Sequence, residues 1–280
     1  MDDQQDALGR TEGIRHGGSI GGDRAQNRAA TLFRNTLAQS GTLLLGYLLS
    51  FILAPILIAR LGLSAFGVWA VTGAFATYAG LLDLGVSRAL ARFIALYDAR
   101  GDERAIRECV GLGLIVVTIV GALATAVAAA AAPLASDELG VLDTGEMRVV
   151  LISSVAIWTF NAYGYVLGAV GIGLRRMLPP NVAGMTAASI NFAFSIAAVI
   201  VSSDLVVYAL ANAAASVVAL GPAMAALAYL WQRPYVALPS PALAREVLGF
   251  SVKTQVGYLA DLVNFQTDKV VIAVLVDVRA

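Results

Sequence analysis

The sequence predicts an all-α polytopic membrane protein, in which a six-helix transmembrane lobe is followed by a seventh helix that starts a second lobe. Two observations carry this prediction. First, 59% of the 280 residues are hydrophobic and only 14% are charged, whereas a soluble domain carries about 25% charged residues. Second, the apolar residues are gathered into long uncharged runs. Basic and acidic residues number 19 each, so the composition excludes an ordinary soluble enzyme, a disordered protein and a basic nucleic-acid-binding protein.

Six runs without Asp, Glu, Lys or Arg are each long enough to cross a bilayer. A helix needs about 20 apolar residues to span the hydrocarbon core, which is about 30 Å thick. Strands of a β-barrel are excluded, because they alternate polar and apolar residues over about ten positions. We therefore predict six transmembrane helices, over residues 35–59, 61–82, 109–136, 149–174, 177–203 and 205–232.

A seventh apolar segment, residues 249–276, carries its polar side chains along one face. At 100° per residue these side chains fall within an arc of about 80°. A helix with such a stripe spans the membrane if the stripe faces protein or water; the alternative is a helix that lies on the membrane surface. A charge near the middle of a span costs at least about 2.5–3.5 kcal/mol. Asp261 therefore needs a partner on another helix, a bound cation, a proton or substrate. The candidates for a substrate or ion pathway in this segment are Lys253, Asp261, Asn264 and Asp268.

The basic residues are distributed unevenly between the two sides of this topology. Fourteen lie in the N-terminal tail and in the second, fourth and sixth loops, whereas Arg60, Arg148 and Arg279 lie on the other side. Because loops rich in Lys and Arg stay in the cytoplasm, the N-terminus is predicted to be cytoplasmic. The predicted organisation is a flexible cytoplasmic tail (1–34), the first transmembrane lobe (35–232), a cytoplasmic inter-lobe linker (233–248) and the first helix of a truncated second lobe (249–280).

Polar residues inside the spans are the remaining candidates for a substrate pathway. Asn161 and Tyr165 share one face of the fourth span, and Asn191 and Asn212 lie in the fifth and sixth. Small and amide residues can hold helices together, since they allow close approach and hydrogen bonds between helices. The Gly164-x-x-x-Gly168 spacing fits that interpretation. The alternative is that these residues line a polar cavity, and for the three asparagines both interpretations stay open.

The sequence contains no group of residues typical of an enzyme. His16, the one histidine, lies in the tail, and Cys109 is the single cysteine. A Ser/His/Asp triad, a redox cysteine pair and a Cys/His metal site are therefore not expected. We predict a protein without enzymatic activity, catalytic residues, metal ligands or a cofactor.

Three stretches of the sequence share a pattern with a known family. The first contains Pro55, then Arg60-Leu61-Gly62 and Phe66-Gly67; the second is a Leu-Asp-Leu-Gly loop with trailing arginines; the third surrounds Asp268-Lys269. As a set they resemble the polysaccharide flippases of the multidrug/oligosaccharidyl-lipid/polysaccharide exporter superfamily. In the second stretch the resemblance marks a cytoplasmic loop motif of Asp83, Gly85, Arg88 and Arg92.

The resemblance implies two lobes around a central cavity and transport by alternating access. Members of this family carry undecaprenyl-linked oligosaccharides across the bacterial cytoplasmic (inner) membrane for O-antigen of lipopolysaccharide, capsule or exopolysaccharide. The implied partners are the lipid bilayer, a lipid-linked oligosaccharide, a coupling ion (H⁺ or Na⁺), and a polysaccharide polymerase with glycosyltransferases. Family members have about twice the seven helices predicted here, so the chain is expected to represent their N-terminal half only.

Two other functions stay open. A multidrug or cation exporter of the same superfamily would have a tighter cavity that carries a carboxylate, and the six uncharged runs count against it. A membrane subunit that scaffolds polysaccharide-synthesis enzymes without transport would have no central cleft.

Overall fold

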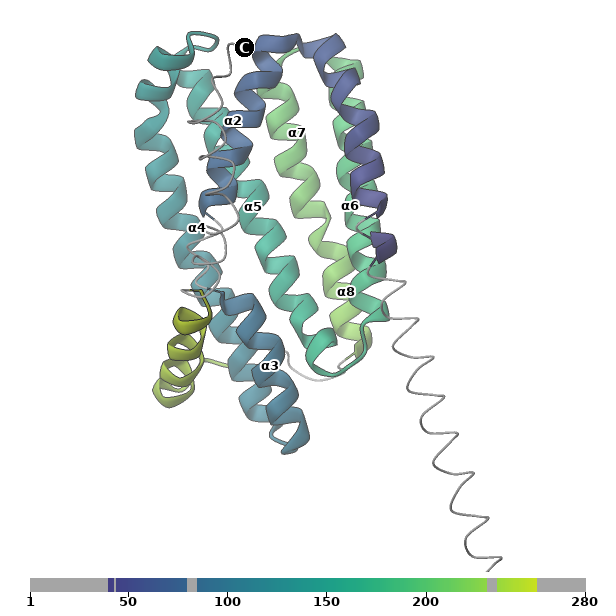
Figure 1. The fold of residues 1–280 in the computed structure, drawn as a ribbon, viewed down its shortest axis with the longest axis vertical. Coiled ribbons are helices and arrows are strands. Elements are labelled where there is room, and N and C mark those ends of the chain that lie inside the picture. The colour runs from purple at the N-terminus through teal and green to yellow at the C-terminus, as the bar shows by residue number, and fades with distance from the viewer. Residues whose placement is uncertain (1–39, 43, 80–84, 231–235, 256–280) are drawn as a thin grey trace, which may run out of the picture.

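A computed structural model describes residues 40–42, 44–79, 85–230 and 236–255. Within these ranges the regular structure is helical throughout, which confirms the predicted all-α class (Figure 1). The helices are Ser40–Leu61, α2 (Leu63–Ala79), α3 (Val86–Ala99), α4 (Glu103–Leu139), α5 (Thr144–Gly173), α6 (Leu178–Val201), α7 (Leu205–Val218), α8 (Leu220–Leu230) and a helix over residues 241–255.

Five helical spans in the described residues are long and apolar enough to cross a membrane: Ser40–Leu61, α4, α5, α6 and the continuous stretch Leu205–Leu230. Each of these spans overlaps one of the predicted runs over most of its length. The remaining run corresponds to α2, of which 17 residues are described; at 1.5 Å per residue they rise about 26 Å. The chain is therefore a polytopic membrane protein. Most of the predicted seventh helix lies outside the described residues.

Helix α4 begins earlier than the uncharged run that predicted it. The Asp102 carboxylate accepts a hydrogen bond from the Ala105 amide at 3.0 Å and caps the helix, which begins at Glu103, six residues before Cys109. A side-chain oxygen at this position satisfies an amide that has no partner within the helix. The 37 residues of α4 rise about 55 Å, well beyond the hydrocarbon thickness of about 30 Å. The first turns of α4, which lie beside α3 (Figure 1), carry Glu103, Arg104, Arg107 and Glu108, so this end is the one expected outside the hydrocarbon.

The last predicted span of the first lobe consists of two helices. Helix α7 ends at Val218 and α8 starts at Leu220, with Pro222 in its first turn. Proline has no amide hydrogen and its ring collides with the carbonyl four residues earlier, which here belongs to Val218. The break therefore follows from Pro222.

Helix α5 is the centre of the bundle, since it packs against α2, α3, α4, α6, α7 and α8. Two helices can approach each other closely where one of them has a glycine, which lacks a side chain. At Gly113 of α4, a Cβ atom would lie 2.9 Å from Val166 Cγ1 of α5; at Gly173, the last residue of α5, it would lie 2.5 Å from Ile94 Cγ2 of α3. Two buried apolar clusters result. One joins α3, α4, α5 and residues 243–247, and the other joins Ser40–Leu61, α2, α4, α5, α6 and α7.

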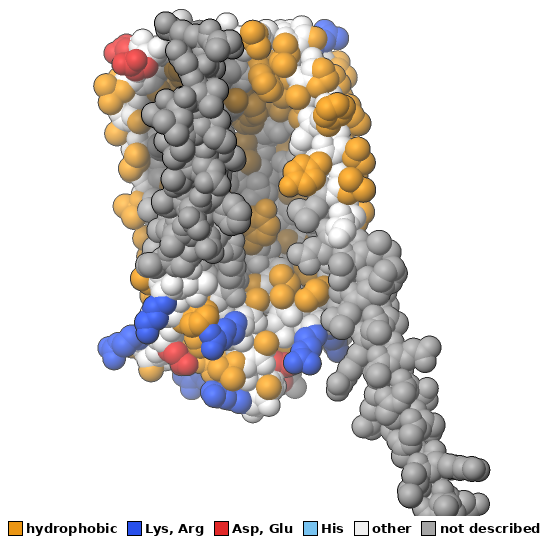
Figure 2. Space-filling model, in the orientation of Figure 1, with side chains coloured by type: hydrophobic (Ala, Val, Ile, Leu, Met, Phe, Trp, Pro, Cys, Tyr) orange, Lys and Arg blue, Asp and Glu red, His pale blue; other side chains and the backbone are white. Residues whose placement is uncertain are grey.

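Most of the described basic side chains gather at one end of the bundle, where α3, the first turns of α4 and the α5–α6 connection meet (Figure 2). Arg60, at the end of the first helix, and Arg148, in the first turns of α5, belong to the opposite end. The charge asymmetry behind the predicted orientation is thus present in the fold. The cytoplasmic location of the N-terminus stays a prediction.

Candidate functional site

A cavity of about 580 Å³ lies between α5, α6 and α8, with Thr42 of the first helix and Ser216 of α7 also in its lining. It is formed by the second half of α5 and the first half of α6, near the connection between these helices. Among its described lining residues none carries a charge. The polar ones are Thr42, Asn161, Tyr165, Asn181, Asn191 and Ser216.

Three residues proposed from the sequence come together in this cavity. Asn161 and Tyr165 lie one turn apart on α5, and Asn191 reaches it from α6. The Tyr165 side chain is 69% exposed, so its ring and hydroxyl are available to a ligand. The Asn191 amide is held in place, because its Nδ2 donates to the carbonyl of Ala187 at 2.9 Å.

Gly164 and Gly168 line the same cavity. A Cβ atom at Gly164 would have no described atom of another element within 4 Å, and one at Gly168 would only touch Pro180 at 3.7 Å. The tight helix contacts suggested by their spacing occur instead at Gly113 and Gly173. Gly164 and Gly168 leave space for a ligand.

Asn212 is placed differently from the other two asparagines. It is 7% exposed and does not line the cavity. Its Oδ1 accepts a hydrogen bond from Ser195 at 2.8 Å, and its Nδ2 donates to the carbonyl of Tyr208 at 2.9 Å. The Ser216 hydroxyl, 3.0 Å from the Asn212 carbonyl and 3.5 Å from Asn191 Oδ1, connects this network to the cavity wall. Asn212 thus joins α6 to α7.

Three further sequence candidates, Gly85, Arg92 and Lys253, lie away from the cavity. Gly85 precedes α3, Arg92 lies on α3, and Lys253 is exposed on the helix over residues 241–255. The side chain of Arg88 is not described. Asp83, Asp261, Asn264 and Asp268 lie outside the described residues, so their part in a substrate or ion pathway stays a prediction.

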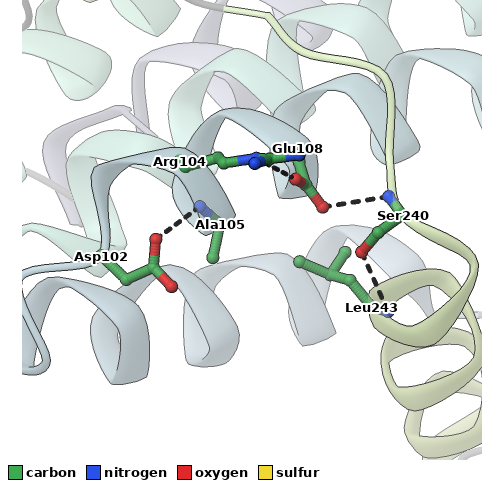
Figure 3. A network of polar contacts seen from close by, with 6 residues as sticks. All are labelled: Asp102, Arg104, Ala105, Glu108, Ser240 and Leu243. Atoms are coloured by element: carbon green, nitrogen blue, oxygen red, sulfur yellow. Dashed lines mark hydrogen bonds and ion pairs between the residues drawn. The ribbon is translucent and has the colours of Figure 1, made fainter.

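A second polar cluster, absent from the sequence candidates, lies at the end of the bundle that carries α3 (Figure 3). Glu108 of α4 is 5% exposed, and its carboxylate accepts hydrogen bonds from Arg104 Nε at 3.0 Å and from the Ser240 amide at 2.9 Å. Ser240 in turn caps the helix over residues 241–255, since its hydroxyl accepts from the Leu243 amide at 3.4 Å. The Ser240-Pro241 pair is the sequence signal for this helix start.

The cavity can bind a ligand through amide and hydroxyl hydrogen bonds and through the faces of Phe160 and Tyr165. Neutral hydroxyl-rich groups match such a lining. In the part of the chain that the structure describes, no three His, Cys, Asp or Glu side chains are grouped so as to hold a metal ion.

Comparison with solved structures finds transporters of one superfamily. A multidrug resistance MATE family transporter of the MOP superfamily, in an outward-facing conformation, aligns with a TM-score of 0.65 at 18% identity, over 86% of this chain and 55% of that one. A MOP superfamily transporter from Pyrococcus furiosus, whose binding pocket is described as having reverse polarity, aligns with a TM-score of 0.60 at 18% identity, over 85% and 55%. A MATE protein in complex with MaD3S aligns with a TM-score of 0.64 at 19% identity, over 86% and 56%.

These likenesses show the transporter fold, and the chain spans about half the length of the proteins it matches. Comparison with curated proteins finds no match. The family model described as "Polysaccharide biosynthesis protein" matches residues 32–280, nearly the whole sequence. The resemblance noted in the sequence is thereby confirmed, and the chain belongs to the polysaccharide biosynthesis protein family, with a fold that matches about half of a MOP superfamily transporter.

Proposed function

We propose that this chain is the first lobe of a flippase that carries an undecaprenyl-linked oligosaccharide across the bacterial cytoplasmic membrane. The product would serve surface polysaccharide or exopolysaccharide synthesis. The observation that carries the proposal is the cavity between α5, α6 and α8, with its amide, hydroxyl and aromatic lining and no charged residue among the described ones. The match to the polysaccharide biosynthesis family supports it.

The chemistry of the cargo suits this cavity. Burying a hydroxyl in hydrocarbon without a partner costs several kcal/mol, so an oligosaccharide crosses a bilayer only where protein groups replace water. Asn161 and Asn191 each offer a donor and an acceptor, and Tyr165 offers a ring face and a hydroxyl. We infer that they contact the sugar portion while the lipid tail stays in the bilayer.

A multidrug or cation exporter is the second candidate, and the fold of the MATE transporters favours it. An organic cation is bound most strongly by a carboxylate or by stacked aromatic rings. The described lining offers the rings of Phe160 and Tyr165 but no carboxylate, so a neutral sugar fits better. A scaffold subunit without transport would need no such cavity, so the cavity also counts against that function.

We further propose that an H⁺ or Na⁺ gradient drives transport. Asp261 and Asp268, with Asn264 and Lys253 on the same face, would form the ion pathway, since an intramembrane carboxylate needs a cation or proton. The N-terminus would lie in the cytoplasm, and glycosyltransferases and a polymerase would act before and after the flippase.

Deletion of the gene tests the proposal. The deletion strain should accumulate lipid-linked oligosaccharide on the inner leaflet and lose surface or secreted polysaccharide, as measured by mass spectrometry of lipid extracts and by polysaccharide staining. Restoring the intact gene should reverse both. Unchanged polysaccharide export would refute the flippase, and a new sensitivity to cationic drugs alongside normal export would favour the exporter.

A further inference from the structure

Residues 236–255 pack against α3 and the first turns of α4, at the end of the bundle where the basic residues gather (Figure 1). On the helix over residues 241–255, the buried side chains recur every four residues, which places them on one face. They are Leu243, Val247, Ser251 and Gln255. Leu243 and Val247 belong to the same apolar cluster as α3, α4 and α5. The helix therefore completes the core of the first lobe.

Aromatic and charged side chains of α3 make further contacts with this helix. The rings of Phe93 and Phe250 meet edge to face, with centroids 5.8 Å apart. The Arg92 guanidinium lies 4.0 Å from the centre of the Phe250 ring, within the range of a cation–π interaction. One turn further, the Tyr97 hydroxyl donates to Glu246 at 3.3 Å. Burial and the nearby Glu246 carboxylate raise the pKa of Tyr97, so its hydroxyl keeps the proton that it donates.

The segment before this helix is attached through its backbone. The Ser240 amide donates to the buried Glu108 carboxylate (Figure 3). The Ala237 amide donates to the Arg107 carbonyl at 3.2 Å. A Cβ atom at Gly111 would collide with the Ala237 carbonyl oxygen. Only glycine therefore allows this backbone to lie so close to α4.

The cytoplasmic loop motif contributes two residues to the same contact. Gly85 has φ +70°, a left-handed conformation that side chains disfavour, and a Cβ atom there would lie 3.1 Å from Gln255 Oε1 and 3.5 Å from the Ser251 carbonyl oxygen. Arg92 stacks on Phe250. Both residues therefore lie where the chain continues toward the predicted seventh span.

We propose that Gly85, Arg92, Phe93, Tyr97 and Glu108 form a docking surface that holds residues 236–255 on the first lobe throughout the transport cycle. That the protein passes through a transport cycle rests on the function proposed above. Among the described residues, the contacts named above join this segment to Gly85, α3 and α4, and releasing it would expose the core that α3, α4 and α5 share with Leu243 and Val247. A close-packed core can switch between discrete packing arrangements, but it does not deform continuously. Residues 236–255 therefore move with the first lobe, as part of it.

A distance measurement on the full chain in lipid nanodiscs tests this inference. Spin labels would be placed at two exposed positions, with Arg100→Cys and Lys253→Cys in a Cys109→Ala background. A second pair, Arg100→Cys with Arg175→Cys, reports the rigidity of the first lobe alone. We expect the 100–253 distance distribution to be as narrow as the 100–175 distribution, and to stay unchanged when undecaprenyl diphosphate is added. A second, longer 100–253 distance would overturn permanent docking.

The variant Phe250→Ala tests the surface itself. It removes the ring that Arg92 and Phe93 contact, so the 100–253 distribution should broaden while the 100–175 distribution stays the same. An unchanged 100–253 distribution would show that other residues hold the segment. Neither measurement depends on transport, so failure of the proposed function would be seen in the deletion strain and not here.

Discussion

Replacing Gly164 by leucine is expected to reduce oligosaccharide transport about tenfold to a hundredfold without unfolding the protein. Gly164 lines the cavity, and a Cβ atom there would meet no described atom of another element within 4 Å. A leucine side chain would therefore extend into the space that we propose the sugar occupies. Forcing extra carbons into a filled site costs about 1–3 kcal/mol, and each 1.4 kcal/mol is a tenfold change in affinity. The measurement is polysaccharide export by the deletion strain complemented with the variant gene.

Gly221→Leu is the matched control for this variant. Gly221 is exposed on α8, is equally free of described neighbours within 4 Å, and does not line the cavity. This variant should export normally, and both variants should reach the membrane in similar amounts. Normal export by Gly164→Leu at normal abundance would show that the cargo does not use this cavity.

Replacing Glu108 by alanine is expected to destabilise the protein by about 2 kcal/mol and to loosen residues 236–255. The carboxylate is buried and accepts the Ser240 amide and Arg104 Nε. Hydrogen bonds to charged groups contribute about 1.5–3 kcal/mol each. Without Glu108 the Ser240 amide loses its acceptor, whereas Arg104 is exposed and can turn to water. Hydrogen exchange should become faster for the amides of residues 240–247, and the melting temperature should fall.

Glu138→Ala serves as the control on the same helix, since Glu138 is exposed near the far end of α4. A surface substitution of this kind changes stability by about 0.5 kcal/mol or less. If Glu108→Ala behaves like Glu138→Ala in both measurements, the hydrogen bond to Ser240 does not anchor the segment.

The helices of this protein could be predicted because hydropathy alone decides which segments cross a bilayer. Helix boundaries that depend on a single residue differ from the ends of the uncharged runs. Asp102 starts α4 earlier, and Pro222 divides the last span into α7 and α8. Aspartate at an N-cap and proline near a helix start are known signals of helix boundaries. Both boundaries can therefore be predicted from the sequence when capping and proline are considered.

The candidate site could be predicted only in part, because it depends on how each helix is rotated. Asn161, Asn191 and Asn212 are equivalent as isolated amides in apolar spans. Packing then turns Asn161 and Asn191 to the cavity, and places Asn212 between α6 and α7 with Ser195 and Tyr208. Spacing along one helix cannot show which neighbour its polar face will meet.

The structure of the segment before the seventh span could also be predicted only in part. Its charge and its place between two lobes predicted a linker over residues 233–248, yet a helix over residues 241–255 crosses that boundary. The recurrence of Leu243, Val247, Ser251 and Gln255 every four residues is the pattern of a helix with one buried face. The division into lobes stays a prediction.

Photo-crosslinking from the cavity tests most directly whether it holds the cargo. Tyr165, which lines the cavity and is 69% exposed, would be replaced by p-benzoylphenylalanine in the full chain, and cells with radiolabelled lipid-linked oligosaccharide would be irradiated. Tyr229 of α8, 76% exposed but outside the cavity, is the matched position. We expect a sugar-bearing adduct at position 165 and little at position 229. Equal labelling at both positions, or none at 165, would contradict the proposed function.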